Sequence, residues 1–183
     1  MNGDGELEEV RLEGSRVYDG KVVHLDVDRV RLADGSEAVR EVVRHPGAAV
    51  IVPVLDDGRV LLVRQFRYPT GGVLLELPAG TVASGDADAL ECARRELAEE
   101  TGHRAAAWRH LATFYSAPGF TDERVSCYLA LGLTPTTEGS LDEDERIDVV
   151  AVPLDEAESM ARRGELHDAK SIAGVLLARG ALR

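Results

Sequence analysis

The order in which strand-like and helix-like segments follow one another constrains the fold of this chain more than any other feature of its sequence. Short apolar or alternating runs recur along the chain, and the turn signals Asp34-Gly35 and Asp56-Asp57-Gly58 join some of them as hairpins. Helical patterns are interspersed among these runs. Because hairpins place strands antiparallel, we expect an α/β (α+β) protein with a mixed sheet covered by helices, and not a doubly wound parallel sheet.

The patterns predict strands at residues 22–32, 38–43, 50–55, 60–66, 111–115, 124–131 and 148–154, and helices at 88–101, 155–163 and 171–179. We divide the chain into an N-terminal β layer, residues 1–44, and a main domain, residues 45–183. The few strands of the N-terminal layer cannot bury both of their faces alone. We therefore expect a two-fold homodimer in which this layer packs on the partner.

The composition excludes several classes of partner. A formal net charge of -12 argues against binding to a nucleic-acid backbone. No apolar run approaches the roughly 20 residues that span a membrane, and the acidic residues 1–10 do not resemble a signal peptide. Two cysteines, Cys92 and Cys127, are too few for a disulfide framework or a cysteine metal site. We expect a cytoplasmic protein.

Residues 88–101 carry the clearest helix signal. Asp88 is a good N-cap residue, and Glu91 three positions later completes a capping box. Gly102 is placed to end the helix in the left-handed conformation. The side that faces the core is expected to carry Leu90, Ala93 and Leu97.

The same helix carries three carboxylates at spacings of three and four residues, Glu96, Glu99 and Glu100, which are neighbours on a helix surface. Their mutual repulsion is relieved when a cation binds them. Mg²⁺ suits such a site because it needs few protein carboxylates and keeps waters and substrate phosphates as further ligands; Mn²⁺ is an alternative. Taken alone, the pattern also fits a solvated acidic helix face.

An apolar run at residues 73–75 is followed by Leu77-Pro78-Ala79-Gly80, upstream of this helix. A glycine beside a carboxylate helix lets the backbone approach a phosphate or a metal ion closely. With Arg95, Glu96, Leu97, Glu99, Glu100 and Gly102, Gly80 resembles the signature of the Nudix hydrolases: Gly, five residues, Glu, seven residues, then R-E-U-x-E-E-x-G-U, where U is aliphatic. Agreement at seven positions makes this a specific resemblance.

The chain departs from the signature at two places. Gly80 and Arg95 are 15 positions apart, where the family pattern has 14, so Ala87 stands at the first acidic position. Asp86 is adjacent and can replace that acid if the loop bulges at Ser84-Gly85. His103 stands in place of the last aliphatic residue and is expected at the surface or the helix end.

Further segments resemble the ADP-ribose pyrophosphatases within this family. Pro118 lies 16 positions after Gly102, and residues 116–123 resemble a Ser-Pro-Gly loop of that group, although an ordinary Pro-Gly turn reads the same way. Residues 39–48, 64–68, 163–165 and 171–175 continue the resemblance, which covers the chain from about Val17 to its end. It implies a Nudix α/β/α sandwich with a mixed central sheet, plus an N-terminal antiparallel sheet layer.

The resemblance also implies roles for single residues. Glu96, Glu99 and Glu100, with the Ala79 carbonyl, would bind Mg²⁺. In the acidic loop at residues 141–145, Glu143 is the expected catalytic base and Glu145 the second candidate, unless that loop is only a solvated acidic run; Glu123 is the next choice. Substrate contacts are implied for Arg67 at the phosphates, for Arg40 and Glu41 at the adenine end from the neighbouring subunit, and for Gly80 and Pro118.

The substrate that the resemblance implies is a nucleoside diphosphate sugar, with ADP-ribose first and AMP and ribose 5-phosphate as products. One alternative is a Nudix hydrolase for another such compound, for example GDP-mannose. The other is a catalytically inactive Nudix module that senses a nucleotide, for which Ala87 leaves room.

Overall fold

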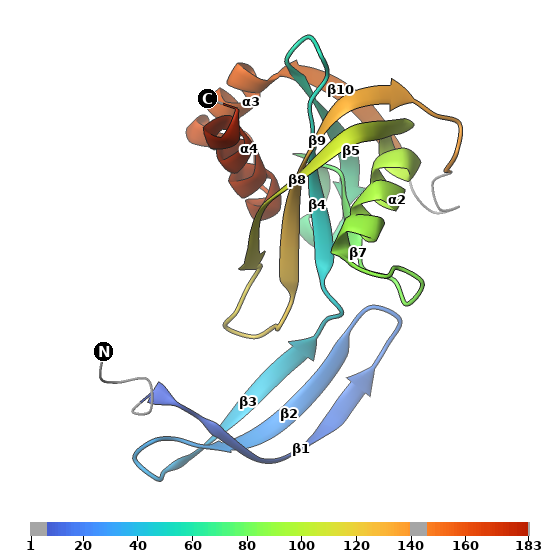
Figure 1. The fold of residues 1–183 in the computed structure, drawn as a ribbon. Coiled ribbons are helices and arrows are strands. Elements are labelled where there is room, and N and C mark those ends of the chain that lie inside the picture. Colours follow the sequence, from blue (N-terminus) through green and yellow to red (C-terminus); the bar gives the residue numbers. More distant parts are fainter. Residues whose placement is uncertain (1–6, 140–145, 183) are drawn as a thin grey trace. The chain divides into compact units, whose positions relative to one another are not determined.

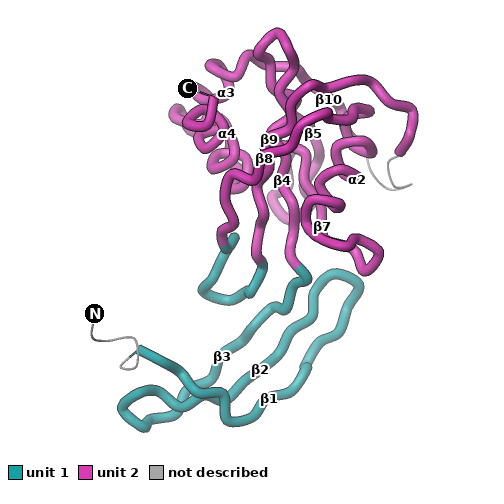
Figure 2. The backbone as a smooth tube through the Cα atoms, in the orientation of Figure 1, with its two compact units in different colours: residues 1–46, 115–123 teal, residues 47–114, 124–183 magenta. Residues whose placement is uncertain are grey.

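A computed structural model describes residues 7–139 and 146–182 of the chain (Figure 1). The chain divides into two compact units (Figure 2): residues 1–46 with 115–123 form the first, and residues 47–114 with 124–183 form the second. Among the described residues, no helix has the length and apolar character needed to cross a lipid bilayer.

The first unit contains an antiparallel sheet of three strands in the order β1-β2-β3. Its strands are β1 (Val10–Asp19), β2 (His24–Arg31) and β3 (Glu37–Arg44). The β2–β3 hairpin is the one predicted from the sequence, and Gly35 adopts a positive φ of 85° in its turn. This sheet is the expected N-terminal antiparallel layer.

The sequence did not predict β1, because this strand is exposed along most of its length and shows no apolar alternation. Ion pairs to the neighbouring strand hold it instead: Arg11 Nε lies 2.9 Å from Asp28 Oδ1, and Arg16 pairs with Asp26. The register shifts twice along the pairing, between Arg11 and Glu13 and between Arg16 and Tyr18, as at β-bulges.

Residues 115–123 belong to the first unit because they hydrogen-bond to the end of β3. The Val43 amide donates to the Phe120 carbonyl at 2.8 Å, and the His45 amide donates to Asp122 Oδ1 at 2.8 Å. A segment more than 70 positions further along the chain therefore lies beside the N-terminal sheet.

The second unit contains two sheets, ordered β10-β5-β6 and β7-β4-β9-β8. The strands are β4 (Ala48–Pro53), β5 (Arg59–Arg67), β6 (Gly72–Glu76), β7 (Ala79–Thr81), β8 (His103–Tyr115), β9 (Arg124–Pro135) and β10 (Ile147–Pro153), with a short 3-10 turn η1 (Tyr68–Thr70) after β5. β4 runs parallel to β9 and antiparallel to β7, so the sheet is mixed, as predicted.

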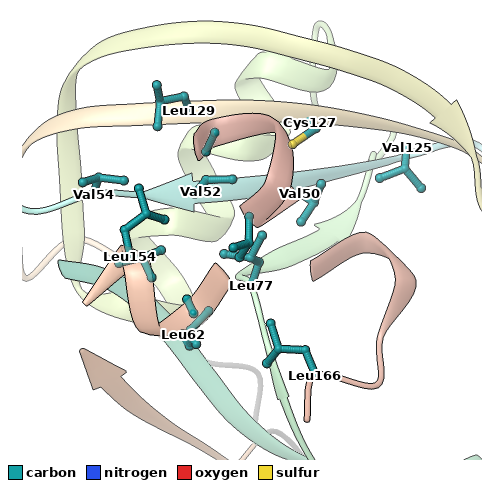
Figure 3. Close-up of a cluster of buried hydrophobic side chains, with 14 of the residues drawn as sticks. Val50, Val52, Val54, Leu62, Leu77, Val125, Cys127, Leu129, Leu154 and Leu166 are labelled. Atoms are coloured by element: carbon teal, nitrogen blue, oxygen red, sulfur yellow. The ribbon is translucent and has the colours of Figure 1, made fainter. Parts of the chain in front are cut away.

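Helices cover both faces of β4. The helices are α2 (Ala89–Thr101), α3 (Leu154–Arg163) and α4 (Ala169–Ala181), all close to the predicted ranges. Val50 and Val52 pack in one buried cluster with residues of α3 and α4 (Figure 3), whereas Ala49 and Ile51 pack in a second cluster with α2. Since alternate residues of a strand point to opposite faces, burial on both sides explains the uninterrupted apolar run of β4.

The strands that were not predicted from the sequence are short or polar. β6 and β7 have five and three residues, too few to show a period. The first part of β8 was missed because β8 is an edge strand with several exposed side chains, among them Arg104 and Arg109, which break the apolar alternation.

Candidate active site

The chain forms α2 where its capping residues are placed. Asp88 is the N-cap, and its carboxylate accepts the amides of Leu90 and Glu91 at 2.9 Å each. The Glu91 carboxylate accepts the Ala87 amide at 2.6 Å, one residue before the amide that a capping box uses. Gly102 ends the helix with a φ of 65°. The predicted bounds and caps of this helix are confirmed.

α2 is fixed on the sheet by its apolar side. Ala93 and Leu97 are fully buried, as is Cys92, while Leu90 is only partly buried. Burial raises the pKa of the Cys92 thiol to about 12, so this sulfur is a thiol and not a thiolate near neutral pH. The buried side orients the neighbouring carboxylates toward β7.

Two carboxylates of α2 lie against the backbone of β7. Glu100 is 7% exposed, and its Oε2 accepts the Ala79 amide at 3.1 Å. A Cβ atom at Gly80 would lie 1.9 Å from Glu96 Oε1, so no residue other than glycine fits there without moving Glu96. The Ala79-Gly80 backbone and the Glu96 and Glu100 carboxylates thus form one surface.

Arg95 draws three carboxylates together. Its Nη1 lies 2.7 Å from Glu96 Oε1 and 2.9 Å from Glu99 Oε2, and its Nη2 lies 3.1 Å from Asp86 Oδ2. The hydrogen bond to Asp86 is the largest cause that raises the pKa of Arg95 above its usual value, and the same bond lowers the pKa of Asp86.

Asp86 reaches Arg95 through a tight turn. The Asp86 amide donates to the Ala83 carbonyl at 3.0 Å, and the Ala83 amide donates to Asp86 Oδ2 at 2.8 Å. This turn contains Ser84-Gly85 and accommodates the extra residue of the loop. Asp86, and not Ala87, therefore supplies the carboxylate that faces Arg95.

The donors on α2 fit a hard divalent cation by their chemistry, because they are carboxylate oxygens. Within residues 7–139 and 146–182, no three histidine, cysteine or acidic side chains converge on one point as metal ligands do. The carboxylates of Glu96 and Glu99 meet on the guanidinium of Arg95 instead. The two carboxylates are close enough to repel each other, so a positive charge between them stabilises the arrangement.

A cavity of about 480 Å³ opens beside Arg95 and Glu99. Its walls come from α2, from β8 through Arg104 and Trp108, and from Gly139. A Cβ atom at Gly139 would lie only 3.0 Å from the Glu99 amide nitrogen, so the chain crosses α2 in direct contact at this point. Sequence reasoning missed the cavity because its walls come from separate segments.

Arg67, expected at the phosphates, forms an ion pair with Glu76, its Nε 2.7 Å from Glu76 Oε2. Glu76 is 3% exposed and also lies 3.7 Å from Lys170 Nζ. This ion pair could not be predicted from the sequence, because Glu76 directly follows an apolar run and has the pattern of a strand end.

Three of the residues expected to contact the substrate lie in the first unit. Arg40 is paired there with Glu9, its Nε 2.9 Å from Glu9 Oε2, whereas Glu41 is exposed on β3. Pro118 lies in the segment that hydrogen-bonds to β3.

Of the candidate bases, only Glu123 is described, also in the first unit, where it accepts the Ser116 hydroxyl and lies 3.8 Å from His45 Nδ1. Glu143 and Glu145 lie outside the described residues.

Comparison with known proteins gives a consistent result. The family model described as NUDIX domain matches residues 43–175. The chain is 39% identical over 166 residues to the ADP-ribose pyrophosphatase of Bacillus subtilis, covering 90% of this chain and 89% of that protein. It is 36% identical to the methanol dehydrogenase activator of Bacillus methanolicus, covering 92% and 91%. A solved structure described as an ADP compounds hydrolase has the same fold, with a TM-score of 0.85 at 24% identity over 96% of this chain and 95% of that one.

Proposed function

Because the chain belongs to the Nudix family of hydrolases, we propose that it cleaves the diphosphate of ADP-ribose to give AMP and ribose 5-phosphate. The observation that carries the proposal is the similarity to an ADP-ribose pyrophosphatase over 90% of the chain. The intact carboxylate side of α2 speaks against an inactive module that only senses a nucleotide.

Glu96, Glu99 and Glu100, with the Ala79 carbonyl, are proposed to bind Mg²⁺, with Mn²⁺ as the alternative. When bound, the ion neutralises diphosphate charge and lowers the pKa of the attacking water. Arg95 orients the Glu96 and Glu99 carboxylates through its Nη1. Gly80 is proposed to let the substrate diphosphate approach the backbone.

Glu143 is proposed as the general base, with Glu145 as the second candidate. The contact between Gly139 and the backbone of α2 supports this assignment, since Gly139 precedes the acidic residues in the sequence.

Substrate binding is proposed for residues outside α2. Arg67 would contact the phosphates, and its ion pair with Glu76 would hold its guanidinium in place. Arg40 and Glu41 would bind the adenine end, and Pro118 would also contact the substrate. Their membership of one compact unit supports a shared role.

We also propose a homodimer in which the N-terminal sheet packs on the partner and lends Arg40 to its site. The sheet carries exposed apolar side chains, among them Val17 and Val39, which a partner would cover. Sedimentation at micromolar concentration tests this, and a fully active monomer contradicts it. A cytoplasmic location is proposed as well, supported by two free, buried cysteines, Cys92 and Cys127.

The decisive experiment is product analysis with Mg²⁺ across ADP-ribose, GDP-mannose, diadenosine tetraphosphate and 8-oxo-dGTP. We expect the highest kcat/KM for ADP-ribose, with AMP and ribose 5-phosphate in equal amounts. A clear preference for GDP-mannose would assign the site to another nucleoside diphosphate sugar. Nucleotide binding without turnover under any divalent cation would instead support a sensing module.

A further inference from the structure

We propose that Ser171 is a positioning residue for the carboxylate site, because its hydroxyl fixes the backbone segment against which Glu96 and Glu100 lie. Ser171 lies on α4 and contributes no atom to the site itself. The inference rests on the proposed function in one respect only, namely that the carboxylates of α2 bind a divalent cation.

The hydroxyl of Ser171 links two elements that are far apart in the sequence. Its Oγ accepts the Leu77 amide at 2.7 Å and donates to Asp168 Oδ2 at 2.5 Å. Ser171 is 0% exposed and Leu77 is 1% exposed, so water does not reach this hydrogen bond. Figure 3 shows Leu77 within the buried cluster of the second unit. The Leu77 amide therefore depends on this serine.

The segment that Ser171 holds leads directly to the site. One residue after Leu77, the Pro78 carbonyl accepts the Ile51 amide at 2.9 Å. The Ala79 amide then binds Glu100 Oε2 at 3.1 Å, and Gly80 lies against Glu96. Residues 77–80 thus connect the start of α4 to the carboxylates of α2.

Charged side chains hold the residue that directly precedes this segment. Asp168 caps α4 and pairs with Lys170, whose Nζ lies 2.5 Å from Asp168 Oδ1 and 3.7 Å from Glu76 Oε1. Glu76 directly precedes Leu77 and pairs with Arg67. Because the Ser171 hydroxyl donates to Asp168, its oxygen is held in one position, where it accepts the Leu77 amide.

Removing the hydroxyl has a local consequence. A buried amide that has lost its acceptor is energetically costly, so the Leu77 amide would shift toward another acceptor. Leu77 can shift only if residues 78–80 move with it. The Ala79 amide and the Ala79 carbonyl would then move relative to Glu100. A role in positioning thus predicts weaker cation binding, whereas a role in packing α4 predicts lower stability alone.

The test compares Ser171→Ala and Ser171→Cys with Val175→Ala in the full chain. Val175 is a fully buried residue of the same helix, and its truncation disturbs α4 without removing the Leu77 hydrogen bond. Mn²⁺ binding is measured without substrate, by the electron paramagnetic resonance of free Mn²⁺, together with the thermal midpoint and the Mg²⁺ dependence of ADP-ribose hydrolysis.

We expect Mn²⁺ affinity to fall about 10-fold in Ser171→Ala and less in Ser171→Cys, because a thiol can still accept the Leu77 hydrogen bond, although weakly. Val175→Ala should lose thermal stability and keep wild-type affinity. If Ser171→Ala binds Mn²⁺ as the wild type does, or if Val175→Ala loses the same affinity, the inference is overturned. Either result leaves the proposed function intact, whereas a wild-type protein that binds Mn²⁺ but hydrolyses no nucleoside diphosphate sugar overturns the proposed function alone.

Discussion

Substitution of Gly80 by alanine separates the geometry of the site from the stability of the fold. The added Cβ would lie 1.9 Å from Glu96 Oε1, 2.0 Å from its carboxyl carbon and 2.7 Å from its Cγ, where ordinary contact begins at 3.4 Å. The carboxylate oxygen must therefore move by roughly 1.5 Å to restore ordinary contact. A misplacement of about 1 Å in an active site is already large enough to affect catalysis. The backbone itself accepts alanine, because Gly80 is not among the glycines with positive φ.

We expect kcat of Gly80→Ala to fall about 10²-fold, because a misplacement of this size costs about that much. Movement of Glu96 also breaks its hydrogen bond to Arg95 Nη1, now 2.7 Å long. The loss of unfolding free energy should stay near 1 kcal/mol, because the atoms that must give way belong to one side chain and not to the backbone.

Steady-state hydrolysis of ADP-ribose and urea denaturation measure the two quantities. Gly85→Ala is the matched control, because this glycine stands five residues further along the chain, with nothing within 4 Å of its Cβ position. It should retain wild-type turnover. A Gly80→Ala protein with wild-type kcat, or one that loses no more activity than Gly85→Ala, would refute the reasoning.

Four further substitutions test the proposed roles. Glu100→Gln should lose most activity while its stability without divalent cations stays equal or rises slightly, since like-charge repulsion falls; wild-type turnover at saturating substrate would contradict the assignment. Glu143→Gln should lower kcat by about 10²–10⁴ with KM nearly unchanged, and Glu145→Gln should do less; the reverse order would move the base by two residues. Asp86→Asn tests the ion pair with Arg95, which lowers the pKa of Asp86. A carboxylate whose pKa is lowered on folding stabilises the protein above its unfolded pKa of about 3.9, and this stability is lost as pH falls through the folded pKa. The variant should therefore be less stable than wild type near neutrality and should lose less stability on acidification. If the unfolding free energies of variant and wild type fall in parallel with pH, the ion pair has no such effect.

Some features of this protein follow from local sequence. Asp88 and Gly102 mark the ends of α2 because capping depends on residues within one turn of the helix. The spacing of Glu96, Glu99 and Glu100 places them near one another on any helix. Likewise the hairpin at Gly35 was predictable, because its turn needs a positive φ that glycine adopts without strain.

Other features were hidden because no local pattern encodes them. β1 is held by ion pairs such as that between Arg11 and Asp28, so it lacks the apolar alternation by which strands are found. Residues 115–123 join the first unit through hydrogen bonds to β3, although they are far from it in the sequence. Arg67 was expected at the phosphates from resemblance, and only the structure shows that Glu76 is its buried partner.

The sequence by itself determined the fold class, the carboxylate helix and the family resemblance, since each depends on periodicity, spacing or the order of segments along the chain. Tertiary structure alone decided which groups meet: Asp86 on Arg95 and Gly80 on Glu96 at α2, and Ser171 of α4 on the Leu77 amide. The physical reason is that these contacts join elements brought together by burial of the core. Their distances depend on how the helices and β7 pack, and packing is a property of the whole second unit.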